Sequence, residues 1–224
     1  MKAAIFDVDG TLVDSVELHA KAWQDAFEEF GHELAFDAIR SQIGKGGDQL
    51  MPVFLSEQEL AAKGKEIEKY RGEVFKAKYF SQVRPLADVR QLFQRLIDGG
   101  WKIALASSAK GEELQTYKDI ARISDLLDTE TSSDDADKSK PHPDIFLAAM
   151  DRLGRAVAPQ DCVVIGDSPY DAEAAGKAGA RASVGVLSGG FPEADLRKAG
   201  CVEIYRDPAD LLRNYKKSIF DKDK

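Results

Sequence analysis

The sequence has little cysteine and no long hydrophobic run. Its two cysteines, Cys162 and Cys201, are too few and too far apart for a zinc site or a disulfide framework. No stretch approaches the roughly 18 apolar residues that a membrane span needs. The first apolar run ends at Asp7, so we expect neither a signal peptide nor a membrane anchor. A reducing compartment, the cytoplasm, is the expected location.

Clusters of basic residues are also missing. The 224 residues contain 31 Lys and Arg against 39 Asp and Glu, which gives a net charge of −8. We therefore expect no nucleic-acid partner, because such partners require a concentrated positive face. An acidic chain can still bind a phosphate ester, since a bound divalent cation reverses the local field. The length fits one domain, or one domain with a modest insertion.

Short apolar segments alternate with helical patterns along most of the chain. These segments fit strands that are buried on both faces of a sheet. They are residues 3–6, 103–106, 163–165, 181–186 and 202–205. Between them, apolar residues recur at helical spacing over 89–97 and 145–153, and glycines follow both patterns. The alternation predicts an α/β fold with a doubly wound parallel sheet.

Residues 16–81 interrupt this alternation. They are rich in helical patterns and contain no convincing strand. One helix is expected before Gly31, and a second helical stretch over 60–80 is expected to be interrupted at Gly64 and Gly72. We predict that 16–81 form a helical cap domain inserted into a catalytic core made of 1–15 and 82–224.

Three polar residues end three of the predicted strands. Asp7, Ser107 and Asp167 each follow directly on an apolar segment. In doubly wound sheets, ligands bind beyond the carboxyl ends of the strands. The sequence therefore predicts that these residues from distant segments converge on one edge of the sheet.

The pair Asp7 and Asp9 carries the strongest chemical signal. Two carboxylates at positions i and i+2 leave a buried strand and enter a Gly10-Thr11 turn. One of them can attack an electrophile and hold a metal, and the other can act as general acid and then as general base. The alternative interpretation is an acidic loop that caps a helix, but the apolar run into Asp7 argues against it.

Four motifs in this order resemble those of the haloacid dehalogenase superfamily. The first is Asp-Val-Asp-Gly-Thr-Leu at 7–12, and the second is a serine that ends a strand, Ser107. The third is Lys140 before Pro-His-Pro-Asp, and the fourth is Gly-Asp-Ser-Pro-Tyr-Asp at 166–171. The resemblance covers nearly the whole chain and implies a Rossmann-like core with an inserted cap.

The resemblance implies a role for each acidic residue of the motifs. Asp7 is similar to the nucleophile that forms an aspartyl-phosphate, and Asp9 to the acid/base. Mg²⁺ would be held by Asp7, the backbone carbonyl of Asp9 and Asp167, with Asp171 contributing through a water molecule. Oxygen ligands suit a hard cation of this kind. Taken alone, Asp167 and Asp171 could instead charge and cap the N-terminus of the helix that follows.

The same resemblance implies a set of phosphate-binding residues. Lys140 and the Ser107 hydroxyl would contact the phosphoryl oxygens, and the backbone N–H of Ser108 would add a contact. Lys45, within the glycine-rich segment 44–47, resembles the substrate-specificity loop and could reach an anionic part of the substrate. The alternatives are a helix-capping serine pair and solvated lysines.

The function expected from these motifs is Mg²⁺-dependent hydrolysis of a small phosphorylated metabolite by a monomer or homodimer. Asp9 favours phosphoryl transfer over dehalogenation, because only an alkoxide leaving group needs a proton. A β-phosphoglucomutase is the first alternative, although no arginine lies between Arg40 and Arg71 to hold a second phosphate. A phospho-acceptor signalling domain and an inactive binding protein are the alternatives of another class.

Overall fold

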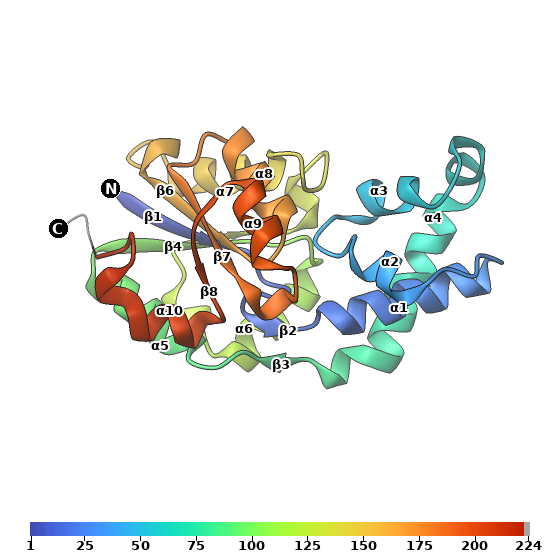
Figure 1. Cartoon of the computed structure of the whole chain (residues 1–224), viewed down its shortest axis with the longest axis horizontal. Coiled ribbons are helices and arrows are strands. Elements are labelled where there is room, and N and C mark those ends of the chain that lie inside the picture. Colours follow the sequence, from blue (N-terminus) through green and yellow to red (C-terminus); the bar gives the residue numbers. More distant parts are fainter. Residues whose placement is uncertain (222–224) are drawn as a thin grey trace.

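The computed structural model describes residues 1–221. A six-stranded parallel sheet, ordered β5-β4-β1-β6-β7-β8, lies at the centre of the α/β part of the molecule (Figure 1). The strands are β1 (Lys2–Phe6), β4 (Trp101–Ala106), β5 (Thr129–Thr131), β6 (Cys162–Gly166), β7 (Ala182–Val186) and β8 (Cys201–Tyr205). The predicted α/β class and the parallel sheet are confirmed.

Helices cover both faces of this sheet. They are α5 (Val89–Asp98), α6 (Gly111–Ala121), α7 (Asp144–Leu153), α8 (Pro169–Lys177), α9 (Glu193–Ala199) and α10 (Pro208–Asn214). Successive side chains of a strand point to opposite faces. Ala4 and Phe6 of β1 accordingly share a buried cluster with residues of α5, α6 and α10. Ala3 and Ile5 share another with residues of α7 and α8. Burial on both faces explains why the strands appear as continuous apolar runs.

One strand of the sheet, β5, was not predicted from the sequence. β5 has the sequence Thr-Glu-Thr, which contains no apolar run, and its place is set by parallel pairing with β4. β4 begins at Trp101, two residues before the predicted segment, and β8 begins at Cys201, one residue before it. Edge positions and strand ends depend on tertiary pairing, which a hydropathy pattern does not contain.

Residues 16–82 lie beside the sheet rather than on one of its faces (Figure 1). This region contains α1 (Val16–Glu29), α2 (Phe36–Arg40), α3 (Gly47–Leu50), α4 (Glu57–Val74), a π-helical turn Phe75–Tyr79 and a 3₁₀ turn Phe80–Gln82. It has its own buried cluster, in which Trp23 and Phe27 of α1 meet Ile67 of α4. A separate core supports the proposal that this region is a cap domain.

The prediction that Gly64 and Gly72 interrupt the long cap helix was wrong. α4 runs through both glycines without a break. A glycine in a helix costs about 1 kcal/mol relative to alanine, which one packed apolar side chain such as Ile67 can offset. A capping box formed by Ser56 and Glu59 also fixes the start of the helix.

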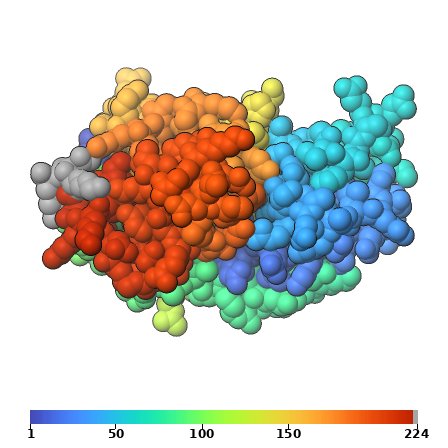
Figure 2. All heavy atoms as spheres, in the orientation of Figure 1, coloured from blue at the N-terminus to red at the C-terminus, as the bar shows by residue number. Residues whose placement is uncertain are grey.

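The chain passes from the core into the helical region and later back again, and these two connecting segments lie side by side. The short strands β2 (Val13–Asp14) and β3 (Arg84–Pro85) pair in an antiparallel manner within these segments. Further along, Arg40 donates to the carbonyl oxygen of Gly189 and Tyr170 donates to that of Ser41, both at 2.7 Å. The two regions are in direct contact across one side of the molecule (Figure 2). No helix formed by the described residues combines the length and the apolarity that a bilayer crossing requires.

Candidate active site

Three carboxylates meet at the carboxyl edge of the sheet. Asp7 follows β1 and Asp167 follows β6, and these two strands are hydrogen-bonded neighbours. Asp171 reaches the same place from the first turn of α8. Carboxylate oxygens of the three residues lie within 4.8 Å of one another, and all three side chains are buried. The structure therefore brings together three acidic residues that sequence analysis had assigned to a site.

Lys140 provides the positive charge among these carboxylates. Its ammonium donates to Oδ1 of Asp7 and, over 2.7 Å, to Oδ1 of Asp171, and the side chain is 2% exposed. Burial opposes the charged lysine, but the two carboxylates outweigh it and raise the pKa of Lys140 above its usual range. The lysine is therefore a fixed cation at the bottom of the site.

A single ammonium does not balance three buried acids. The pKa of Asp7 is raised to about 7. Burial is the main cause, and the nearby charges of Asp171 and Asp9 add to it. Together they outweigh Lys140, which lowers the pKa. Burial and the nearby Asp171 and Asp7 likewise raise the pKa of Asp167 well above its ordinary value. A bound cation would remove this excess of negative charge.

The donor set fits a hard divalent cation. Oxygens of Asp7 and Asp167 are the kind of ligand that Mg²⁺ prefers. Both oxygens of Asp171 already accept hydrogen bonds, Oδ1 from Lys140 and Oδ2 from the hydroxyl and N–H of Ser168. Asp171 thus completes a capping box of α8 and orients Lys140. With both oxygens occupied, Asp171 is better suited to contact a bound cation through a water molecule than directly. The predicted contribution of the Asp9 carbonyl stays a prediction.

Two glycines and a threonine enclose Asp167, and sequence analysis had assigned none of the three a role. A Cβ atom on Gly189 would lie 1.7 Å from Oδ2 of Asp167, and one on Gly10 would lie 2.5 Å from it. The hydroxyl of Thr11 donates to Oδ2 of Asp7 at 3.3 Å and to Oδ1 of Asp167 at 3.4 Å. Gly10 also has φ +77°, a left-handed conformation that favours glycine. Gly10 and Thr11 could have been noticed inside the first motif, but Gly189 carries no local signal.

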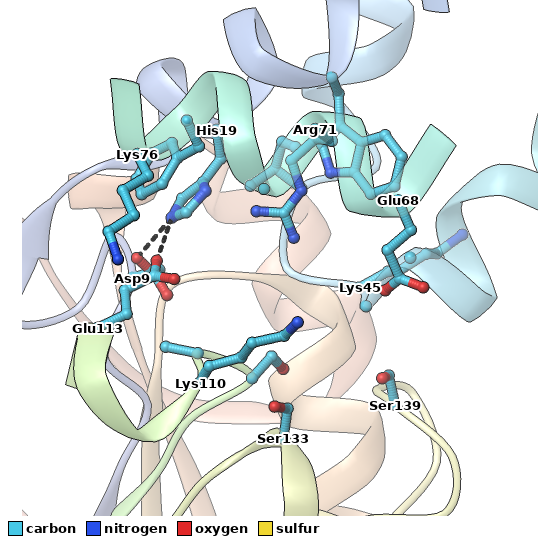
Figure 3. Close-up of a pocket in the computed structure, with 18 of the residues that line it drawn as sticks. Asp9, His19, Lys45, Glu68, Arg71, Lys76, Lys110, Glu113, Ser133 and Ser139 are labelled. Atoms are coloured by element: carbon cyan, nitrogen blue, oxygen red, sulfur yellow. Dashed lines mark hydrogen bonds and ion pairs between the residues drawn. The ribbon is translucent and has the colours of Figure 1, made fainter. Parts of the chain in front are cut away.

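The Asp9 carboxylate contacts residues at the start of the helical region. Its Oδ1 accepts hydrogen bonds from the hydroxyl of Ser15 at 2.5 Å and lies 2.9 Å from Nε2 of His19 (Figure 3). Burial alone would raise the pKa of Asp9, but the charge and hydrogen bond of His19 and the hydrogen bond of Ser15 together lower it. The His19 ring is stacked on Phe75, with centroids 4.0 Å apart. Residues from both sides of the first connecting segment therefore position Asp9.

The predicted phosphate-binding serines occupy different environments. Ser107 is fully buried at the end of β4, and its hydroxyl accepts a hydrogen bond from the N–H of Ala109 at 3.0 Å. Ser108 is exposed and lines the cavity described below. The Ser107 hydroxyl thus stabilises the turn after β4, and Ser108 lies on the surface that a ligand would meet.

A cavity of about 660 Å³ lies between the core and the helical region. The core contributes Asp7, Asp9, Ser108, Lys110 and Lys140 to its walls. The helical region contributes residues from α1, from the segment 43–47, from α4 and from the π-helical turn (Figure 3). A ligand bound to Asp7 would therefore be enclosed by both regions.

Lys45 lines this cavity, but its ammonium has other partners. It donates to Oε1 of Gln42 at 2.6 Å and lies 4.7 Å from the ring centre of Tyr170. Burial lowers the pKa of Lys45 against the opposite effect of Glu173. The segment around Lys45 also contacts the core, since Oδ2 of Asp48 accepts from the N–H of Ser139. The predicted contact between Lys45 and a substrate stays a prediction.

The matching family model and three of the most similar known proteins are described as hydrolases or phosphatases. The model of the family described as haloacid dehalogenase-like hydrolase matches residues 4–184. A protein named phosphorylated carbohydrates phosphatase from Thermotoga maritima is 27% identical over 219 residues, which are 98% of this chain and 100% of that protein. A phosphoglycolate phosphatase from Aquifex aeolicus is 28% identical, covering 95% of this chain and 96% of the other. The crystal structure of a hydrolase from Pseudomonas syringae superimposes with a TM-score of 0.86 at 27% identity, covering 97% and 99% of the two chains.

Proposed function

The chain belongs to the haloacid dehalogenase-like hydrolase family, and from this premise we propose that it hydrolyses a small phosphorylated metabolite through an aspartyl-phosphate on Asp7. Its enzyme class, a phosphoric monoester hydrolase, agrees with the relatives that are named phosphatases. One observation carries the proposal. The Asp7 carboxylate lies at the wall of an enclosed cavity, in contact with Lys140 and beside two further carboxylates.

In the first step, a carboxylate oxygen of Asp7 attacks the phosphorus atom of the ester. The bond between phosphorus and the leaving oxygen breaks, and the Asp9 carboxyl group donates a proton to that oxygen. Asp9 is ionised in the ligand-free site because of His19 and Ser15. It must therefore take up a proton as the anionic ester binds, since nearby negative charge favours the protonated form.

In the second step, water replaces the leaving group. The ionised Asp9 removes a proton from a water molecule, and the resulting oxygen attacks the phosphorus of the aspartyl-phosphate. Inorganic phosphate leaves, and the Asp7 carboxylate is regenerated. Ser15 and His19 hold Asp9 at the boundary with the helical region, where it can serve both steps.

Charge neutralisation is the main contribution of the remaining residues. The Lys140 ammonium offsets charge on the phosphoryl oxygens, and the N–H of Ser108 adds a donor. Mg²⁺, held by Asp7 and Asp167, would supply a Lewis acid for the same oxygens when bound. The helical region excludes water from the cavity and contacts the leaving group. We propose the boundaries 1–15 and 82–224 for the core and 16–81 for this cap.

The two cysteines support a proposal for the cellular location. Cys162 and Cys201 are both free and buried. We propose the cytoplasm, where thiols stay reduced. The expected partner is a small phosphate ester, and the assembly is a monomer or homodimer.

The test is release of inorganic phosphate from a panel of small phosphate esters, with Mg²⁺ and with EDTA. Wild-type protein and the Asp7→Asn variant are compared. Asp14→Asn serves as a control, because Asp14 is an exposed acid in the short strand β2. We expect Mg²⁺-dependent release by the wild type and the control only. Release that persists in Asp7→Asn would remove Asp7 from the nucleophile role.

A further inference from the structure

Arg71 of α4 lines the cavity without an anionic partner. Within residues 1–221, its guanidinium makes no hydrogen bond and no ion pair, and its Nε atom is buried without any polar contact. The guanidinium lies 5.1 Å from the ring centre of Trp23, which holds it in place by a cation–π contact. A buried donor without an acceptor destabilises a folded protein. We therefore expect a bound ligand to supply the acceptor for Arg71.

A second free cation lies on the core side of the same cavity. Lys110, the residue before α6, also lines the cavity, and its ammonium has no hydrogen bond or ion pair with the described residues. In Figure 3, Arg71 and Lys110 point into the cavity from opposite walls, one from the cap and one from the core. The wall contains five other lysines. Four have polar partners, which are Lys45 with Gln42, Lys69 with Glu73, Lys76 with Glu112, and Lys140 with Asp7. The fifth, Lys65, belongs to α4 on the same side of the cavity as Arg71 and has no polar partner among the described residues.

The acidic residues of the wall do not neutralise this pair. The Glu113 carboxylate accepts a hydrogen bond from Tyr117 at 2.7 Å and lies 3.9 Å from His19. Glu68, one turn before Arg71 on α4, extends toward the side of Lys45 and away from the guanidinium (Figure 3). The space between Arg71 and Lys110 is thus a positive region of the cavity, separate from the carboxylates around Asp7.

We propose that Arg71 and Lys110 form a subsite for a second anionic group of the substrate. This inference rests on the proposed phosphatase function, and it defines the substrate class. The substrate is a phosphate monoester whose leaving group carries a carboxylate or a second phosphate. Guanidinium groups bind both anions through two parallel hydrogen bonds, and the Trp23 ring lies beside the group at 5.1 Å. The proposal gives Arg71 a contact of the kind that the resemblance implied for Lys45, whose own contact with a substrate stays a prediction.

The experiment compares matched pairs of esters that differ only in the second charge. Phosphoglycolate is paired with hydroxyethyl phosphate, and propanediol bisphosphate with hydroxypropyl phosphate. The variants are Arg71→Gln and Lys110→Gln. The control is Lys63→Gln, an exposed cation on α4 that is not part of the cavity wall. Thermal unfolding confirms that each variant is folded before its kcat and KM are measured.

We expect the wild type to prefer the charged member of at least one pair. Arg71→Gln should lower kcat/KM for that ester by about 10- to 100-fold, as expected for loss of a charge-assisted hydrogen bond. Most of the change should be in KM, and the neutral partner should change less than about threefold. The carboxylate and bisphosphate pairs show which anion the subsite binds. Lys63→Gln should behave as the wild type with every ester.

Two results would overturn the inference in different ways. If the wild type hydrolyses charged and neutral esters equally well, or if Arg71→Gln affects both members of each pair alike, the subsite is wrong and the phosphatase function stands. If the wild type releases phosphate from no ester of the panel, the proposed function fails, and the subsite fails with it.

Discussion

Replacement of Lys140 by methionine removes the only cation in direct contact with the buried carboxylates of the described structure. The Lys140 ammonium contacts Asp7 and Asp171, whose side chains are nearly as inaccessible as its own. Methionine keeps most of the volume of the side chain, so the change acts mainly on charge. Two buried carboxylates then lose their counter-ion while the surrounding packing stays close to its original form.

The expected loss of stability follows from the burial of this pair. Removing one partner of a buried ion pair destabilises a protein by about 3–5 kcal/mol, because the other charge is left without compensation. The carboxylates can take up protons instead, which limits the loss. We therefore expect about 3 kcal/mol at mildly alkaline pH in EDTA. A smaller loss is expected in mild acid, where Asp7 is protonated already.

Urea unfolding with and without Mg²⁺ measures this loss, and phosphate release measures activity. Lys118→Met is the matched control, because Lys118 is also buried but pairs with Glu130, whose side chain is 37% exposed. A pair open to solvent contributes about 1 kcal/mol or less. Excess Mg²⁺ should restore part of the stability of Lys140→Met and none of that of Lys118→Met. Activity of Lys140→Met should fall by about 100-fold or more.

Equal losses in the two variants would refute this reasoning. So would a loss below about 1 kcal/mol for Lys140→Met in EDTA, since it would mean that solvent or protons already compensate the carboxylates. A stability that does not respond to Mg²⁺ would contradict the assignment of the carboxylates to a metal site.

Three further predictions concern the acidic residues and their surroundings. Asp9→Asn should lower kcat by about 100- to 10,000-fold while the fold is retained, measured by steady-state phosphate release; a normal rate would exclude Asp9 as acid/base. Gly189→Ala should raise the Mg²⁺ concentration needed for half-maximal activity by about 10- to 100-fold, because the new methyl group would displace Asp167. Gly176 has open space around it, so Gly176→Ala should leave this concentration unchanged. In buffer without divalent cations, the free energy of unfolding should fall as the pH rises from about 4 to about 7. The reason is that the folded state keeps a proton on Asp7, whose pKa is raised from 3.8 to about 7; stability that rises over this range would contradict that shift.

Much of the fold follows from the sequence because the central strands are buried on both faces. Continuous apolar runs before Asp7 and Asp167 reflect that burial, and both residues lie at the ends of the strands as predicted. The parts that were missed depend on partners far away in the sequence. β5 exists through its pairing with β4, and α4 continues across its glycines because Ile67 packs against α1.

The residues of the site likewise fall into a predictable group and an unpredictable one. Asp7, Asp167, Asp171 and Lys140 belong to local motifs, and the structure places all four in contact or within a few ångströms. The surroundings of the site could not be predicted, because they arise from packing between the helical region 16–82 and the rest of the chain. The lone guanidinium of Arg71 is an example, since it is distinguished only by the absence of a partner in the folded chain.

The central claim is that Asp7 is the nucleophile. The most direct measurement is an acid quench of the enzyme during turnover of a good ester with Mg²⁺, followed by mass analysis of the peptide that contains residues 1–15. The account predicts a phosphoryl group on Asp7 in the wild type, and more of it in Asp9→Asn if that variant still forms the intermediate. It also predicts neither phosphorylation nor phosphate release in a folded Asp7→Asn variant. Phosphate release without any phosphorylated peptide, or with the phosphoryl group on another residue, would contradict it.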